Sequence, residues 1–171
     1  MTPKTTGRKD QQTALPGGAR AHPPLIDGVH IHELGNIITH SGIMTEIFRD
    51  DWPLADFAIR QINFVDLNPG GVTDWHYHAG QTDHLLGVGG AIKLALIDGR
   101  PASPTLGARE IVRFGAARPV VVTVPPGVWH ALRNESGRPA AYLNLADRLY
   151  DYASPDNFRL SPDAPEVAGF L

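Results

Sequence analysis

The sequence predicts an all-β protein, an antiparallel barrel or jelly roll built from short strands. The 171 residues include 18 Gly and 15 Pro, which divide the chain into short stretches. Many of these stretches are rich in β-branched and aromatic residues, which favour strands. No stretch carries the long apolar stripe of an amphipathic helix. Hydrophobic residues make up 42% of the chain, enough for the core of one domain.

Along the chain, the first segment differs from the rest. Residues 1–24 are polar, rich in Thr, Gln, Gly and Pro, and lack periodicity, so we expect a disordered N-terminal arm before a single domain over residues 25–171. We expect the Asp98-Gly99 pair to close a hairpin turn. The candidate strands of the domain lie between turn signals, at residues 29–34, 44–48, 59–67, 92–97, 110–114, 120–124, 128–132 and 141–145.

Composition excludes several classes of function. The net charge is −3 and no dense run of Lys or Arg is present, so we expect neither nucleic acid nor a membrane surface as partner. The absence of cysteine excludes a disulfide scaffold, a cysteine nucleophile and cysteine-ligated metal. No apolar run has the length of a signal peptide or a membrane span, and we therefore expect a cytoplasmic protein with a small-molecule substrate.

Two segments contain the candidate functional residues. In the first, His76 and His78 stand two residues apart among strand-forming residues, and Asp83 follows. In the second, His130 comes just after a Pro-Pro-Gly turn. Alternation along a strand places both imidazoles of the first pair on one face. Such pairs often serve only as hydrogen-bonded strand residues, but three imidazoles and a carboxylate also suit a divalent transition metal.

Alternation also predicts what the neighbours of these residues do. Trp75 and Trp129 each precede one of the histidines, so we expect both rings on the opposite face, packed between sheets or at a subunit interface. His84 is the reserve ligand if Asp83 faces solvent, since adjacent positions point opposite ways. His30 and His32 form a second His-x-His pair, but no acidic residue follows at the same spacing. We interpret both as surface strand residues.

The two segments resemble the motif pair of the cupin superfamily. The matching positions are Gly70, His76, His78, Asp83 and Gly90 in the first segment, and Pro125, Gly127, His130 and Asn134 in the second. Aspartate replaces the usual glutamate, and the glycine that opens the second motif is missing. The resemblance implies a double-stranded β-helix, a jelly-roll barrel, in which His76, His78, Asp83 and His130 hold one divalent metal ion of Fe, Mn, Ni, Co or Zn.

Most of the chain, from about Glu46 onward, also resembles the dTDP-4-dehydrorhamnose 3,5-epimerase family. The best-matching parts are Gln61-x-Asn63, Gly71-Val72 with His76-Tyr77, Ser103-Pro104-Thr105-x-Gly107, Val124 to His130, and Asp151 to Pro155. This resemblance implies that His76 is a general base beside a sugar ketone, that Asp163 is its aspartate partner, and that no metal is needed. It also implies a homodimer formed through the N-terminal strands.

Some family positions carry different residues here. The substrate-binding arginine falls at Thr73 or Asp74, the active-site lysine at His84, and the proton-donating tyrosine near Asp147, with Tyr142 and Tyr150 out of register. An acidic residue at the arginine position would repel a nucleotide diphosphate. We therefore expect poor activity on dTDP-4-keto-6-deoxyglucose.

Three hypotheses follow for the function. The first is a metal-dependent cupin enzyme, an isomerase or oxidoreductase, acting on a small oxygenated substrate such as a sugar or keto compound. The second is a metal-free epimerase of the nucleotide-sugar type. The third is a non-catalytic cupin that binds a small ligand. The catalytic candidates are His76, His130 and Asp163.

Overall fold

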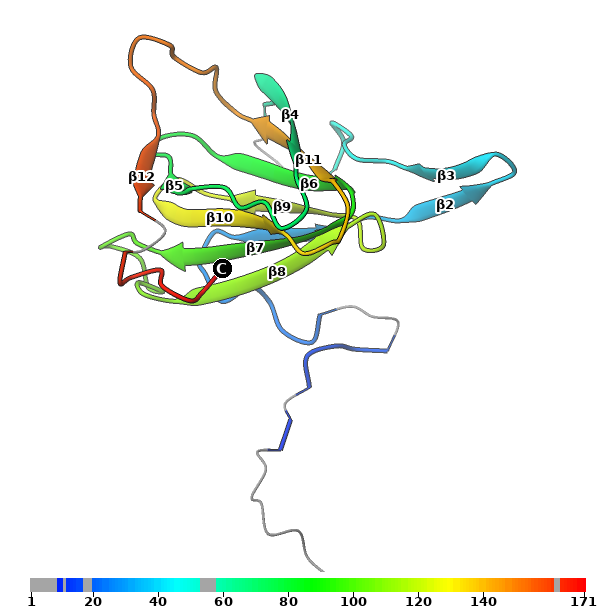
Figure 1. The fold of residues 1–171 in the computed structure, drawn as a ribbon, viewed down its shortest axis with the longest axis horizontal. Coiled ribbons are helices and arrows are strands. Elements are labelled where there is room, and N and C mark those ends of the chain that lie inside the picture. Colours follow the sequence, from blue (N-terminus) through cyan, green and yellow to red (C-terminus); the bar gives the residue numbers. More distant parts are fainter. Residues whose placement is uncertain (1–8, 11, 17–19, 53–57, 162–163) are drawn as a thin grey trace, which may run out of the picture.

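The chain folds as an all-β protein (Figure 1). The structure, a computed structural model, describes residues 9–10, 12–16, 20–52, 58–161 and 164–171. Within these residues the chain forms twelve strands and no helix, which confirms the all-β prediction. Among the same residues, none belongs to a helix long and apolar enough to cross a membrane.

Ten of the strands form two antiparallel sheets of five strands each. The first sheet has the order β1 (His30–Glu33), β9 (Val120–Val124), β6 (Asp83–Gly89), β11 (Ala140–Ala146) and β4 (Gln61–Leu67). The second has the order β12 (Phe158–Leu160), β5 (Trp75–Tyr77), β10 (Val128–Asn134), β7 (Ala91–Asp98) and β8 (Arg109–Gly115). The sheets are linked by crossing connections, since sequence neighbours such as β5 and β6 lie in different sheets.

The main core lies between the sheets. Leu85 and Val122 of the first sheet and Leu94 and Leu132 of the second belong to one buried cluster. Leu94 and Leu132 have no exposed surface. Because side chains alternate along a strand, every second residue of β6 and β10 points into this space. The inward direction of the candidate site residues follows from the same alternation.

A second cluster lies on the outer face of the second sheet. Trp75, only 2% exposed, packs there with Ala131 and with Val167 from the C-terminal segment. Its ring lies 6.2 Å from that of Phe170, and Trp129 is partly buried in the same cluster. The prediction that both tryptophans turn away from the histidines is confirmed. Of their two expected places, the one between the sheets is wrong, because the C-terminal segment covers the outer face instead. The one at a subunit interface stays a prediction.

The remaining pair of strands is a hairpin, β2 (Asn36–Thr39) and β3 (Gly42–Thr45), which projects away from the two sheets (Figure 1). Four of its apolar side chains are exposed to solvent, those of Ile37, Ile38, Ile43 and Met44, with Ile38 85% exposed. On β4, at the edge of the first sheet, Ile62 and Phe64 are exposed as well. The hairpin is thus an apolar arm without a core of its own.

The end of the N-terminal segment is tied to the barrel. Arg20 forms an ion pair with the buried carboxylate of Glu110 on β8. The same carboxylate accepts a hydrogen bond of 2.7 Å from the backbone N–H of Leu25. Residues 1–8, 11 and 17–19 of the expected disordered arm lie outside the described part of the chain.

Asp98 ends β7, and the chain returns antiparallel in β8, so the expected hairpin is present, but its loop is longer than a tight turn. The chain runs through residues 99–108 before β8 starts. The Asp98 carboxylate holds this longer loop by accepting hydrogen bonds from Arg100 Nη2 at 2.8 Å, Ser103 Oγ at 2.5 Å and Thr105 Oγ1 at 2.6 Å. Local turn chemistry alone did not reveal this network, because its donors lie up to seven residues further along the chain.

Candidate functional site

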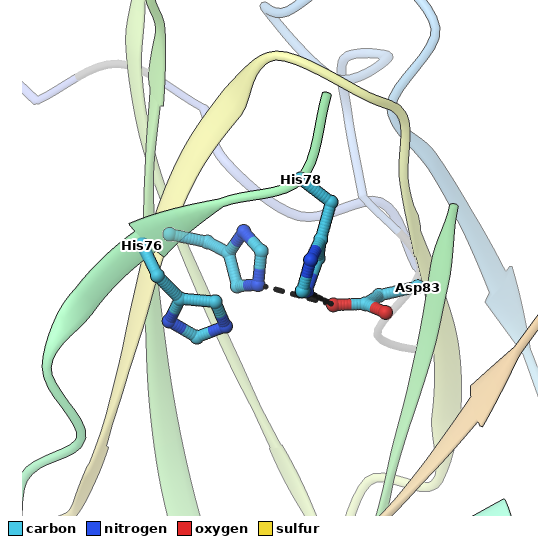
Figure 2. Close-up of side chains that lie close together, drawn as sticks. His76, His78 and Asp83 are labelled. Atoms are coloured by element: carbon cyan, nitrogen blue, oxygen red, sulfur yellow. Dashed lines mark ion pairs between the residues drawn. The ribbon is translucent and has the colours of Figure 1, made fainter. Parts of the chain in front are cut away.

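Four side chains meet between the sheets at one end of the barrel. His76 lies on β5, His78 lies just beyond it, and His130 lies on β10, paired in register with His76. Asp83 opens β6 in the other sheet. One ligand atom from each residue lies within 4.8 Å of all the others. Figure 2 shows His76 and His78 extending from one strand segment toward Asp83 on the facing strand.

Strand alternation separates Asp83 from its neighbour. Asp83 is 1% exposed and faces His78 and His130, whereas His84 turns to the other face of β6. There His84 Nδ1 lies 2.9 Å from the hydroxyl oxygen of Thr123, and burial lowers the pKa of His84 to about 4. His84 is therefore not part of the cluster, and the aspartate supplies the carboxylate, as the motif spacing predicts.

Each of the three histidines is oriented by a backbone carbonyl. A carbonyl oxygen can only accept a hydrogen bond, so the ring nitrogen facing it, Nδ1, carries the proton. The neutral rings therefore keep a lone pair on Nε2. The pairs are His76 Nδ1 with the carbonyl of Asp74 at 2.9 Å, His130 Nδ1 with that of Val128 at 3.0 Å, and His78 Nδ1 with that of Asp156.

His78 is also held from the opposite side. The backbone N–H of Gly127, in the turn before β10, donates a hydrogen bond of 2.8 Å to the carbonyl of His78. Gly127 adopts a φ of 79°, and a Cβ there would lie 2.6 Å from Cγ of Arg100, so the turn requires glycine. The Pro-Pro-Gly turn recognised in the sequence thus connects the two motifs physically.

Only one of the two carboxylate oxygens of Asp83 has hydrogen-bond partners in the described structure. Its Oδ1 accepts hydrogen bonds from Gln81 Nε2 at 2.7 Å and Asn144 Nδ2 at 3.1 Å. Its Oδ2 lies 3.3 Å from Nε2 of His78 and 3.2 Å from Nε2 of His130. Nevertheless neither Asp83 Oδ2 nor His130 Nε2 has a hydrogen-bond partner in the described structure. Buried atoms of this kind are costly to leave unmatched, and a divalent cation between them would satisfy both.

The electrostatics of the cluster differ from residue to residue. Burial, together with repulsion from His130, lowers the pKa of His76 to about 3. Burial also lowers the pKa of His78, but the adjacent carboxylate of Asp83 and the contact with Asp156 outweigh it and raise that pKa overall. Burial raises the pKa of Asp83, yet His130 and His78 bring it well below its ordinary value. At neutral pH the cluster therefore combines an anionic carboxylate with a neutral His76.

A pocket of about 230 Å³ opens beside His78. Gln81, Arg148, Tyr150 and Asp156 are among its lining residues. Its volume is below the ~300–1,000 Å³ of pockets for drug-sized ligands, which suits a single sugar-sized group. The pocket meets the cluster at His78, which belongs to both.

Two arginines near the cluster could not be predicted from the sequence. Arg148 is exposed and lines the pocket. Arg159 pairs in register with His76, and its guanidinium donates a hydrogen bond of 2.9 Å to the carboxylate of Asp74. The expected repulsion from Asp74 is therefore offset by a neighbouring cation. No local pattern could reveal this, because it depends on the pairing of β12 with β5.

Asp163, the predicted aspartate partner of His76, lies outside the described residues, so its role stays a prediction. Within the described structure, the carbonyl of Asp74 holds Nδ1 of His76. The metal-binding and catalytic roles of His76, His78, Asp83 and His130 also stay predictions, although the structure brings all four together.

Known proteins share both the fold and much of the sequence. A family model for the cupin domain matches residues 63–146. A probable low-salt glycan biosynthesis epimerase, Agl13 of Haloferax volcanii, is 30% identical over 141 residues, which cover 82% of this chain and 90% of the relative.

Solved structures point in the same direction. A dTDP sugar isomerase from Desulfovibrio desulfuricans has a TM-score of 0.78 at 27% identity, covering 84% of this chain and 90% of that one. ChmJ, a 3'-monoepimerase from Streptomyces bikiniensis in complex with dTDP-quinovose, has a TM-score of 0.76 at 28% identity, covering 86% of this chain and 76% of that one. These likenesses confirm both predicted resemblances. The chain belongs to the cupin superfamily, as a relative of the nucleotide-sugar epimerases.

Proposed function

We propose that the protein is a sugar epimerase that inverts a carbon next to a carbonyl group at the cluster of His76, His78, Asp83 and His130. The observation that carries the proposal is the state of His76. Its Nδ1 is held by the carbonyl of Asp74, so the neutral ring presents the lone pair of Nε2 as its basic atom. It stands at the position of the general base in a family of epimerases, and the relatives named above support the same class of reaction.

The chemistry needs one base and one acid. His76 Nε2 takes the proton from the carbon beside the carbonyl, so the C–H bond breaks, an N–H bond forms, and the electron pair moves onto the carbonyl oxygen. Return of a proton to the opposite face inverts the carbon, with no net oxidation. In the protonated form that its raised pKa favours, His78 keeps Nδ1–H on the carbonyl of Asp156 and would offer Nε2–H, beside Asp83, to the developing oxyanion.

The second proton requires a donor on the other side of the substrate. Tyr150 lines the pocket next to His78, whereas Tyr142 is buried in the core, where burial and the charge of Asp83 raise its pKa to about 12. We assign the second donor to Tyr150, because Tyr150 lines the pocket and Tyr142 does not. Replacement of a general acid typically costs ~10²–10⁴ in rate, and Tyr150→Phe should fall in that range.

A metal-assisted form of the same reaction is a second candidate. Three imidazoles with Nδ1 fixed on carbonyls and two buried atoms without partners fit a divalent cation held by His76, His78, Asp83 and His130. Such a cation would supply a Lewis acid for the carbonyl oxygen. The base would then be a group other than His76, because its Nε2 cannot bind a cation and take a proton at once, so the two candidates make opposite predictions for added metal.

The cations near the cluster favour a substrate with an anionic group. Arg148 lines the pocket and Arg159 lies on the strand next to His76. A guanidinium binds phosphate oxygens through parallel hydrogen bonds, which supports a sugar that carries a phosphate or diphosphate. Replacing Arg148 by Gln should raise KM more than it lowers kcat, because the contact is present before and during proton transfer.

The proposal is tested by following epimerisation directly. Nucleotide-linked 4-ketohexoses are incubated with the protein, and the ring configuration of the products is read by NMR. The assay is repeated after treatment with a chelator and after addition of Zn(II), Mn(II), Co(II), Ni(II) or Fe(II). Epimerisation that survives the chelator supports the metal-free reaction, and restoration by one ion supports the metal-assisted one. No epimerised product under any of these conditions would refute the proposal.

A further inference from the structure

We propose that Asp156 is a positioning residue that holds His78 and the loop of residues 79–81 in place for the reaction. The consequence for catalysis rests on the proposed function, but the geometry stands on its own. Asp156 lies just before β12, 78 positions along the chain from His78. Nothing in the sequence around it signals such a role.

The contacts of Asp156 are concentrated on one short loop. Its Oδ1 accepts a hydrogen bond of 2.7 Å from the backbone N–H of Ala79. Its Oδ2 accepts two more, from Gly80 at 2.8 Å and from Gln81 at 3.2 Å. Its own backbone carbonyl accepts the Nδ1–H of His78. A single residue therefore fixes both the imidazole and the three residues that follow it.

Only a carboxylate matches this set of donors. Three N–H groups point at two oxygen atoms, and a carboxylate offers acceptors alone. Successive backbone N–H groups of this kind form a concavity that favours an anion. In Asp156→Asn, the amide NH₂ would face at least one N–H of the loop, so that variant keeps part of the contact set. Asp156→Ala removes all three side-chain contacts and leaves only the backbone carbonyl.

The loop connects the two halves of the cluster. It follows His78, just beyond β5 of one sheet, and leads to Asp83 at the start of β6 in the other. Gln81, its last residue, donates a hydrogen bond of 2.7 Å to Asp83 Oδ1. A Cβ on Gly80 would lie 3.1 Å from the guanidinium carbon of Arg148, so the loop also packs against the cation of the pocket. Holding this loop thus sets the ring of His78 and the carboxylate of Asp83 together.

A simpler role would be to anchor the C-terminal segment, and the experiment separates the two. The variants are Asp156→Ala and Asp156→Asn, with Asp151→Ala as the matched control. Asp151 belongs to the same segment and accepts hydrogen bonds of 2.8 and 3.2 Å from Ala153 and Ser154, none of which reaches the cluster. Because Asp151 also lines the pocket, this control is compared by NMR and amide exchange and not by turnover. If Asp156 only anchored the C-terminal segment, Asp156→Ala and Asp151→Ala would change the state of His78 and the exchange of the loop to a similar extent.

Two readouts need neither metal nor substrate. Long-range ¹H–¹⁵N NMR reports which nitrogen of His78 carries the proton, and amide exchange reports the loop. We expect Nδ1–H in the wild type, a mixture of tautomers in Asp156→Ala, and exchange at Ala79, Gly80 and Gln81 at least tenfold faster. Asp151→Ala should match the wild type. Asp156→Asn should be intermediate, and it remains informative if the alanine variant does not fold.

Turnover of the nucleotide-linked ketosugar completes the test. Loss of groups that orient a metal-ligating histidine typically costs ~10–100-fold, and for Asp156→Ala we expect a loss of that size in kcat rather than in KM. Wild-type His78 signals and wild-type exchange in a folded Asp156→Ala variant would overturn the positioning role, as would unchanged kcat in an active enzyme. If the wild type proves inactive, the proposed function fails, whereas the NMR and exchange results still decide whether Asp156 positions His78.

Discussion

Replacing His130 should weaken the binding of a divalent cation by about a hundredfold if the cluster is a metal site. His130 is 2% exposed, and its Nε2 lies 3.2 Å from Asp83 Oδ2 without a hydrogen-bond partner. It is the only member of the cluster from β10. His130→Gln keeps most of the side-chain volume, so it removes the ligand atom with little change in packing, and His130→Ala removes both.

The magnitude follows from the number of ligands. Four-ligand structural zinc sites bind with apparent free energies of about 10–16 kcal/mol. An equal share for each of four ligands is about 3 kcal/mol, which corresponds to roughly a hundredfold in Kd at about 1.4 kcal/mol per tenfold. The alanine variant should also lose stability through the cavity that it leaves, whereas the glutamine variant should remain close to the wild type.

The assay is a competition between the metal-free protein and a chromophoric chelator for Zn(II) or Co(II). The wild type, His130→Gln and His130→Ala are compared with His30→Gln, which changes an exposed histidine on β1 outside the cluster. We expect one ion per wild-type chain and unchanged affinity in the control. Equal affinity of the wild type and His130→Gln, or no stoichiometric binding by the wild type, would refute the metal-site reasoning and leave the metal-free reaction as the better account.

Three further predictions concern stability, substrate and assembly. Burial lowers the pKa of His84 to about 4, so between about pH 6.5 and 4 the unfolded state binds a proton that the folded state does not. Stability should therefore fall as the pH falls through this window, by up to about 1.4 kcal/mol per pH unit from this group, and urea unfolding of His84→Gln should show a flatter pH profile. Turnover of dTDP-4-keto-6-deoxyglucose should be slow, by ~10²–10⁴ relative to an authentic epimerase assayed in parallel, because Asp147 stands where the family has its proton-donating tyrosine and Tyr150, the donor proposed here, is out of register with that position; equal rates would contradict this. The exposed apolar hairpin predicts a homodimer, and sedimentation should show Ile38→Lys as a monomer; a wild-type monomer at high micromolar concentration would contradict the dimer.

The convergence of the cluster could be predicted from the sequence, because it depends mainly on local geometry. Alternation fixes His76 and His78 on one face, and it fixes Asp83 opposite in direction to His84. The turn before β10 fixes where His130 enters its strand. These relations span a few residues each, so motif spacing is enough to carry them. The same alternation predicted the direction of Trp75, but not the C-terminal segment that covers it.

The features that could not be predicted depend on contacts between distant segments. Asp156 reaches the loop after His78 only because the chain returns through β12 to pair with β5. The same pairing places Arg159 beside Asp74, which changes the charge balance inferred from the sequence. The loop held by Asp98 was missed because a short turn signal precedes donors that lie further along the chain. Register and tertiary pairing, rather than residue type, decide all three.

The most direct test of the central claim is proton exchange in deuterated water. The wild type is incubated with nucleotide-linked 4-ketohexoses in D₂O, and deuterium at the carbons beside the carbonyl is measured by NMR and mass spectrometry, with His76→Gln and the exposed-site control His30→Gln in parallel. The account predicts deuterium uptake by the wild type and the control, and uptake reduced by about 10²–10⁴ in His76→Gln, as expected for loss of a general base. Equal uptake in His76→Gln and the wild type, or no uptake above the rate without protein, would contradict it.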